Sequence, residues 1–173
     1  AVYERFTELY NNRVDIASIK HPERDCIYDE AFKIVQLKLE HDTMIFNWCS
    51  LLRHEGYPAH NGLYETSILY RLSSSKVRCI DKLWWNCINK YSKRDQLSLN
   101  YAIWINQPNT AYFLSVDEDA RRTKLFNYKA HSAKRSIIKQ SFFEKIRWWN
   151  NFRNVQSHAW AKRRYYRLFY KLL

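Results

Sequence analysis

Apolar residues recur along the chain with two different periods, which predict interleaved helices and strands. Spacings of three and four residues, typical of one buried helix face, predict five helices: residues 2–11, a segment from Pro22 onward, 43–55, 76–91 and a segment that begins at Ser92. Pro22 suits the first turn of a helix, where its missing N–H is no loss. Apolar–polar alternation predicts three strands: residues 14–19, 63–72 and 110–116. We therefore expect an α/β fold, richer in helix than in strand, with the three strands in one sheet.

The charge of the chain is divided unevenly between two parts. Residues 1–120 hold 14 Lys and Arg against 16 Asp and Glu, a net charge of −2. Residues 121–173 hold 15 Lys and Arg against the single acid Glu144, a net charge of +14. This asymmetry predicts a near-neutral globular domain over residues 1–120, followed by a tail that binds an anionic partner: a membrane, a nucleic acid or a polyanionic polymer.

The tail also carries apolar side chains in a helical pattern. On a helical wheel of residues 160–173, four cations share one narrow stripe: Arg163, Arg164, Arg167 and Lys171. Side chains such as Tyr165, Leu168 and Phe169 cover a broad apolar arc. A basic aromatic helix of this kind can lie at an anionic membrane surface. An alternative of equal weight is that the apolar arc packs on the domain while the cations face water. The two arrangements are compatible with each other.

Composition excludes several classes of site. The chain has two Gly residues and neither a GxGxxG nor a GxxxxGK[ST] sequence, so any nucleotide must be held without a glycine-rich loop. Its four cysteines form no CxxC pair and have no histidine at a zinc-type spacing, so the sequence predicts no metal ligands. No apolar run reaches the ~18 residues of a membrane-spanning helix.

Three polar clusters carry the candidate chemistry, and the first two flank predicted strands. The first is HPERDCIYDE (residues 21–30), at a strand-to-helix junction of the kind where α/β sheets bind ligands. His21 and Arg24 are suited to holding a phosphate; alternatively, His21 caps the helix and the acids favour its N-terminal dipole. The second runs from Gly62 to Arg71, where Glu65 and Arg71 share one predicted strand face, as ligand-binding groups or as an ion pair.

The third cluster is SKRDQLS (residues 92–98), at the start of a predicted helix. Ser92 and Asp95 have the spacing of a capping box, with Asp in place of the usual Glu. Alternatively, Asp95 faces a cleft, where a carboxylate can deprotonate or orient a sugar hydroxyl. The spacing alone leaves both interpretations open.

Together, the three clusters resemble a known family. The strings HPERDCIYDEA, EGYPAHNGLYETSILYR and WWNCINKYSKRDQLSLNYAIW are similar to the plant-mucilage-type (TOD/MUCI) glycosyltransferase-like domain family, in the right order over about residues 14–106. The resemblance points to a bacterial-type member and implies a partial GT-A-like fold. It also implies a nucleotide-sugar donor and a glycan or lipid-linked acceptor in surface polysaccharide synthesis.

The resemblance draws attention to individual residues without fixing their roles, and the chemistry of each residue suggests its role. Asp95 and Glu65 are expected to be the catalytic carboxylates, with Asp95 as the base or acceptor-orienting group and Glu65 also binding sugar hydroxyls. The expected substrate-binding residues are His21, Arg24, Tyr28, Gly62, Arg71, Arg94 and Gln96. Within this set, His21 and Arg24 would face the diphosphate, and Arg71 would bind sugar hydroxyls.

Further expectations depend on the resemblance and, for residues 121–173, on their charge. Members usually begin with a nucleotide-binding half, which we expect to be missing upstream of residue 14. A divalent cation, Mn²⁺ or Mg²⁺, is implied with the nucleotide-sugar, although the sequence offers no ligand set for it. Residues 121–173 would hold the protein at the inner membrane face, on the cytoplasmic side. The alternatives are a non-catalytic partner in a polysaccharide assembly, or a membrane- or nucleic-acid-binding module; RNP, KH and helix-turn-helix signatures are lacking, which disfavours nucleic acid.

Overall fold

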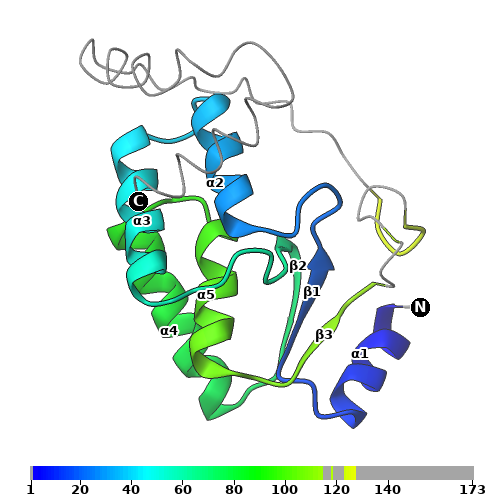
Figure 1. The fold of residues 1–173 in the computed structure, drawn as a ribbon. Coiled ribbons are helices and arrows are strands. Elements are labelled where there is room, and N and C mark those ends of the chain that lie inside the picture. The colour runs from blue at the N-terminus through cyan, green and yellow to red at the C-terminus, as the bar shows by residue number, and fades with distance from the viewer. Residues whose placement is uncertain (1, 115–117, 119–122, 128–173) are drawn as a thin grey trace.

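The computed structural model describes residues 2–114, 118 and 123–127, which form an α/β fold rich in helix (Figure 1). The helices are α1 (Val2–Asn11), α2 (Ile27–Gln36), α3 (Asp42–His54), α4 (Ser75–Lys90) and α5 (Gln96–Asn106). The strands are β1 (Ile16–Lys20), β2 (Tyr64–Arg71) and β3 (Thr110–Tyr112), and they form one sheet, as predicted. The predicted tail lies outside the described residues except at 123–127. Within the described part, no helix is both long and apolar enough to cross a membrane.

The sheet has β1 in its centre and contains one large irregularity. β1 pairs antiparallel with β2 and parallel with β3. Ser18 is opposite Leu69, whereas the next residue, Ile19, is opposite Glu65, so residues 66–68 bulge out of β2. The buried Ser18 hydroxyl lies 2.6 Å from the Glu65 carbonyl and 3.0 Å from the Ile68 carbonyl, so its one proton is shared between carbonyls at the start and the end of the bulge. The strict alternation predicted along β2 is therefore wrong at these residues.

Helices cover both faces of the sheet. Successive side chains of β1 point to opposite sides, and both sides include apolar residues, so each face needs a helix to bury it. Ile16 packs with α4 and α5, while Ala17 and Ile19 pack with Leu9 of α1. α2 and α3 pack against the outer side of α5, around the buried Trp48. Figure 1 shows α1 alone on one side of the sheet and the other four helices on the other. This arrangement is consistent with part of a GT-A-like fold.

Two helices begin later than predicted, and a side chain accounts for each delay. α2 begins at Ile27 rather than near Pro22, because the His21 ring accepts the N–H groups of Glu23 and Arg24 and holds that segment as a turn. α5 begins at Gln96 with Asp95 as its N-cap. Ser92, predicted to start this helix, instead accepts the N–H of Arg94 at 3.1 Å. The capping-box interpretation of Ser92 is therefore wrong, and Asp95 alone caps the helix.

Candidate functional site

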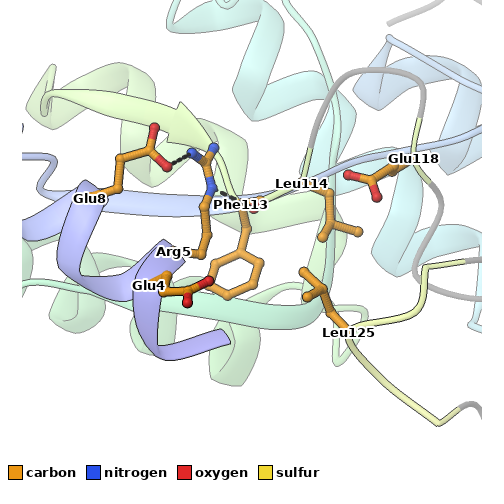
Figure 2. A pocket seen from close by; sticks show the side chains of 7 residues that line it. All are labelled: Glu4, Arg5, Glu8, Phe113, Leu114, Glu118 and Leu125. Carbon is orange, nitrogen blue, oxygen red and sulfur yellow. Dashed lines mark hydrogen bonds and ion pairs between the residues drawn. The ribbon is translucent and has the colours of Figure 1, made fainter. Parts of the chain in front are cut away.

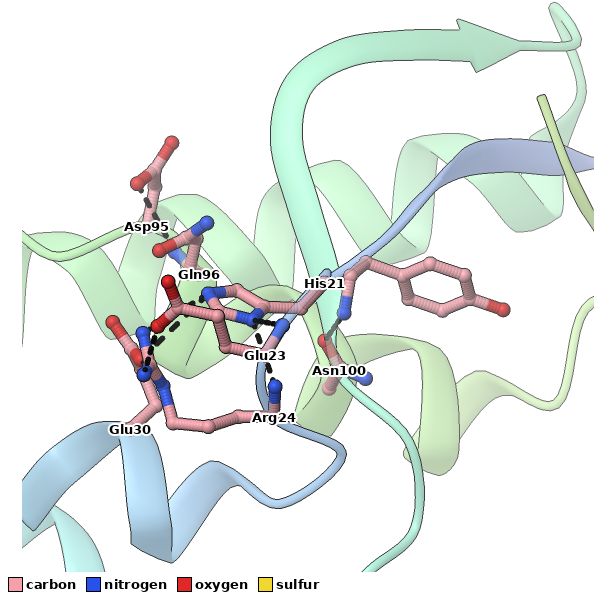
Figure 3. Close-up of polar contacts among 8 residues, drawn as sticks. His21, Glu23, Arg24, Glu30, Asp95, Gln96 and Asn100 are labelled. Atoms are coloured by element: carbon pink, nitrogen blue, oxygen red, sulfur yellow. Dashed lines mark hydrogen bonds and ion pairs between the residues drawn. The ribbon is translucent and has the colours of Figure 1, made fainter. Parts of the chain in front are cut away.

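The end of the sheet at which β1 finishes collects all three polar clusters. β2 runs antiparallel to β1, so Glu65 lies opposite Ile19, two residues before His21. The N–H of His21 donates to the carbonyl of Leu63 at 2.8 Å, and the Thr66 hydroxyl donates to Oδ2 of Asp95 at 2.7 Å. Figure 3 shows the side chains from the β1–α2 connection together with Asp95, Gln96 and Asn100 of the α5 segment. Segments far apart in the sequence thus meet at one place, as their joint role in a site requires.

His21 is a buried, neutral histidine at this end of the sheet. Its Nδ1 accepts the N–H groups of Glu23 and Arg24 at 3.2 and 3.1 Å, which leaves this nitrogen unprotonated, and its Nε2 lies 3.3 Å from Nη2 of Arg24. Nε2 lies 3.9 Å from a carboxylate oxygen of Glu30. Burial and the neighbouring Arg24 guanidinium lower the pKa of His21 below its usual value of 6.5. The ring therefore acts as an uncharged clamp on the connection that carries Arg24.

Arg24 is shared between two carboxylates. Its Nε donates to Glu30 at 2.5 Å and its Nη1 donates to Glu23 at 2.8 Å. The side chains of Glu30 and Arg24 are 10% and 20% exposed, so this pair is largely removed from water, whereas Glu23 is exposed. Arg24 is thus needed to neutralise a buried acid, and only its remaining N–H groups can meet a ligand.

Glu65 has a buried carboxylate oxygen without a hydrogen-bond partner. Its Oε1 accepts the hydroxyl of Ser67 at 3.0 Å, while Oε2 is buried and receives no hydrogen bond from any residue that the structure describes. Glu65 is also close enough to His21 to influence its pKa. A buried carboxylate oxygen without a donor is costly, and such a group in a folded protein calls for a specific explanation, such as a bound water or ligand.

Asp95, in contrast, has both carboxylate oxygens engaged. Oδ1 accepts the N–H of Gln96 at 3.0 Å, and Oδ2 accepts the Thr66 hydroxyl. Its backbone carbonyl accepts the indole N–H of Trp84 at 3.0 Å. Asp95 therefore joins the bulge of β2 to the start of α5 and to α4, which makes it a residue that positions its neighbours.

Asn100 is a positioning residue that the sequence analysis missed. It is 4% exposed on α5, where its Nδ2 donates to the Gly62 carbonyl at 3.0 Å and its Oδ1 accepts the Tyr64 N–H at 3.1 Å. These bonds hold the segment that leads into β2, where Gly62 has a positive φ of 81° that suits glycine. An Asn within the apolar run LSLNYAIW was the available signal for this role.

Three of the predicted substrate-binding residues lie elsewhere. Arg71 is at the opposite end of β2, where it pairs with Asp81 of α4 at 3.0 Å. Tyr28 is 2% exposed, donates to the Tyr57 carbonyl at 2.8 Å, and burial raises its pKa to about 12. Arg94 donates to the Leu39 carbonyl at 3.0 Å, beyond the far end of α2. These contacts give all three a role in packing, and the bulge explains why Glu65 and Arg71 do not act together.

A cavity of about 400 Å³ lies apart from these clusters, between α1 and the end of β3 (Figure 2). Its lining includes three glutamates, Glu4, Glu8 and Glu118, with Phe113 among the apolar groups. The guanidinium of Arg5, also in the lining, donates to the carbonyls of Tyr112 and Phe113 and to Glu8. Because this cation is engaged and the carboxylates repel anions, the cavity does not suit a nucleotide diphosphate.

Comparison with known families shows which family the chain belongs to. A family model described as "TOD1/MUCI70, glycosyltransferase-like domain" matches residues 1–131. The chain belongs to the TOD1/MUCI70 family. The match extends beyond residues 14–106, where the three motifs lie, and it confirms the resemblance. No curated protein and no solved structure matches the chain.

TOD1/MUCI70 membership makes the chain a glycosyltransferase-like protein, and such proteins often use a divalent cation. Mg²⁺ and Mn²⁺ prefer several oxygen ligands. Among the described residues, the one group with metal-ligand spacing consists of Cys26, Asp29 and His60, which offers a thiol, a carboxylate and an imidazole. This set does not suit Mg²⁺ or Mn²⁺, so no step of a transfer reaction is assigned to a metal.

Proposed function

We propose that this protein provides the acceptor-binding side of a glycosyltransferase. In this proposal a sugar passes from a nucleotide-sugar to a glycan or lipid-linked acceptor in surface polysaccharide synthesis. The observation that carries it is Oε2 of Glu65, buried without a partner where the three clusters meet. Glu65 as a residue is half-buried, so a rotation of its side chain would expose this oxygen to a sugar hydroxyl, a donor that it can accept.

The local charge favours the acceptor over the donor. The Arg24 cation contacts the carboxylates of Glu23 and Glu30, and Glu65 lies close to the neutral His21. An excess of carboxylates repels a diphosphate but accepts hydrogen bonds from hydroxyl groups. We therefore reassign His21 and Arg24 from the diphosphate to the support of the acceptor site.

Glu65 takes the role of general base in this scheme. Its carboxylate accepts the proton of the acceptor hydroxyl while the hydroxyl oxygen bonds to the anomeric carbon of the donor sugar. The bond from that carbon to the diphosphate oxygen breaks, and the nucleoside diphosphate leaves with the electron pair. Asp95 serves as a positioning residue, because its bond to Thr66 fixes the bulge that follows Glu65.

The decisive variant is Glu65→Gln, which keeps the size of the side chain and removes its basicity. Loss of a general base lowers turnover by about 100- to 10,000-fold. The measurement is nucleoside diphosphate release by the full chain across a panel of nucleotide-sugars and oligosaccharide acceptors, with the matched variant Glu8→Gln of the α1 cavity as control. Undiminished turnover in Glu65→Gln would refute the role of Glu65. A loss confined to Glu8→Gln would move the site to the cavity, and no turnover by the wild-type chain would contradict the proposal.

We further propose that residues 121–173 bring this site to an anionic membrane, at the cytoplasmic face of the inner membrane. The support is their net charge of +14, since each basic residue near an anionic surface contributes about 1 kcal/mol. If a third of the cations reach the surface, they supply several kcal/mol, enough for reversible binding to the membrane where a lipid-linked acceptor would lie.

The corresponding measurement is co-sedimentation with vesicles. We expect binding to anionic vesicles at low salt, release by added salt and no binding to neutral vesicles. Deletion of residues 133–173 should abolish binding, with circular dichroism to verify that the remainder stays folded. Equal binding to both kinds of vesicle, or to neither, would contradict the membrane proposal. Salt-sensitive RNA binding without vesicle binding would favour the nucleic-acid alternative.

A further inference from the structure

Three side chains near the start of α2 have the chemistry and spacing of a transition-metal site. Cys26 is the N-cap of α2, Asp29 lies in its first turn, and His60 belongs to the segment between α3 and β2. One ligand atom from each, including the Cys26 sulfur, lies within 4.8 Å of the others. Cys26 is buried, Asp29 half-buried and His60 exposed, so the cluster runs from the core to the surface.

A fourth residue supports the histidine as a ligand. A carboxylate oxygen of Asp25 lies 2.9 Å from Nδ1 of His60. A carboxylate on one ring nitrogen is the usual second contact of a metal-binding histidine, because it orients the ring and makes it a better ligand. Asp25 and His60 are 35 positions apart, so the fold, and not local sequence, creates this pair.

The ligand types indicate which cation fits. Thiolate and imidazole favour zinc-type cations, whereas Mg²⁺ and Mn²⁺ prefer oxygen ligands. Tetrahedral zinc with bonds of about 2.0–2.3 Å needs ligand atoms about 3.5 Å apart, so the separations within the group would shorten by at most about 1.3 Å. The exposed ring of His60, on a surface segment, can make this movement.

We propose that Cys26, Asp29 and His60 bind a zinc-type divalent cation, with water as the fourth ligand, and that Asp25 positions His60. On binding, the Cys26 thiol releases its proton to solvent and the thiolate bonds to the metal. The cation fastens the segment around His60 to the start of α2. This segment leads through Gly62 into β2, so the metal would hold one wall of the end of the sheet that carries Glu65. The proposal is independent of the transfer reaction.

The test is metal binding by the intact, chelator-stripped chain, measured by competition with a chromophoric zinc chelator. Zn²⁺ should bind and raise the unfolding temperature, while Mg²⁺ at the same concentration should have little effect. Co²⁺ in place of zinc should give a thiolate-to-metal charge-transfer band, which Cys26→Ser abolishes. His60→Ala should lower zinc affinity by at least about 100-fold and Asp25→Asn by about tenfold, in line with the loss of a ligand and of its second contact.

Matched controls are His54→Ala and Cys79→Ser, because both residues are exposed and lie outside the cluster. Their zinc affinity should equal that of the wild type. Because Cys26 is buried, Cys26→Ser can disturb folding; the exposed His60 provides the test in that case. Zinc affinity unchanged in His60→Ala, no zinc binding by the folded wild type, or a cobalt complex without a thiolate band would overturn the proposal.

Discussion

The two ends of β2 differ in how their charges are balanced. At the end that carries Arg71, the structure shows two cation–carboxylate pairs: Arg71 pairs with Asp81, and Lys76 lies 3.9 Å from Asp15. At the other end, Arg24 contacts Glu23 and Glu30, Glu65 lies close to His21, and one oxygen of Glu65 has no partner among the described residues. Ion pairs at the surface stabilise a protein weakly, whereas a buried acid such as Glu30 depends on the cation that neutralises it. The difference identifies which polar cluster is suited to meet a ligand.

The largest expected effect is a difference in the stability lost when Arg24 or Arg71 is replaced. Arg24→Met leaves Glu30 buried without its cation and should lower the free energy of unfolding by about 3–5 kcal/mol. Arg71→Met breaks a pair whose side chains are 47% and 37% exposed and should cost less than about 1 kcal/mol. Urea denaturation followed by tryptophan fluorescence measures both. Equal losses would show that the two ends of β2 do not differ in the way described.

A second test concerns the support of the His21 end by α5. Asn100→Leu is similar in size but leaves the Gly62 carbonyl and the Tyr64 N–H without partners, which should cost about 2 kcal/mol. Asn106→Leu, in the last turn of the same helix, removes a bond to the Ala102 carbonyl and should cost well under half as much. The same denaturation series tests this order, and a larger loss for Asn106→Leu would contradict the role given to Asn100.

The smallest effect is a pH dependence. The pKa of His21 is lowered by burial and by Arg24, so the unfolded chain binds a proton that the folded chain resists. The contribution of His21 to stability is therefore complete above about pH 6.5 and is lost as the pH falls below it, by at most about 1.4 kcal/mol per unit. His21→Asn, whose side-chain oxygen can accept the same N–H groups, should flatten this slope in chelator-treated protein. A slope unchanged from that of the wild type would mean that another group is responsible.

Sequence patterns predicted the elements well and their irregularities poorly. Helical spacing located α1 and α4 to within a residue at each end, because periodic burial is repeated over many positions. The bulge in β2 and the late starts of α2 and α5 depend on single long-range or loop contacts, such as Ser18 with Glu65, that leave no periodic signal. The prediction that Glu65 and Arg71 lie on one face of the strand is wrong for this reason, because it assumed an unbroken strand.

The candidate site was predicted in outline only. The motif strings led to the sheet end where His21, Arg24, Glu65 and Asp95 meet. The sequence could not show that Asp95 is fully engaged while Glu65 keeps a buried oxygen without a partner, because this depends on packing. Similarly, Cys26 and His60 are too far apart in sequence to display a metal-type spacing.

The contacts of Arg5 also determine whether a further strand can pair with the β3 edge of the sheet. β3 is an outer strand, and the carbonyl of Tyr112 lies on its side away from β1, where Arg5 of α1 occupies it. An incoming extended peptide would have to displace α1 before it could pair with β3. Edge-to-edge aggregation through this strand is thereby hindered, since aggregation of that kind requires a free row of backbone groups.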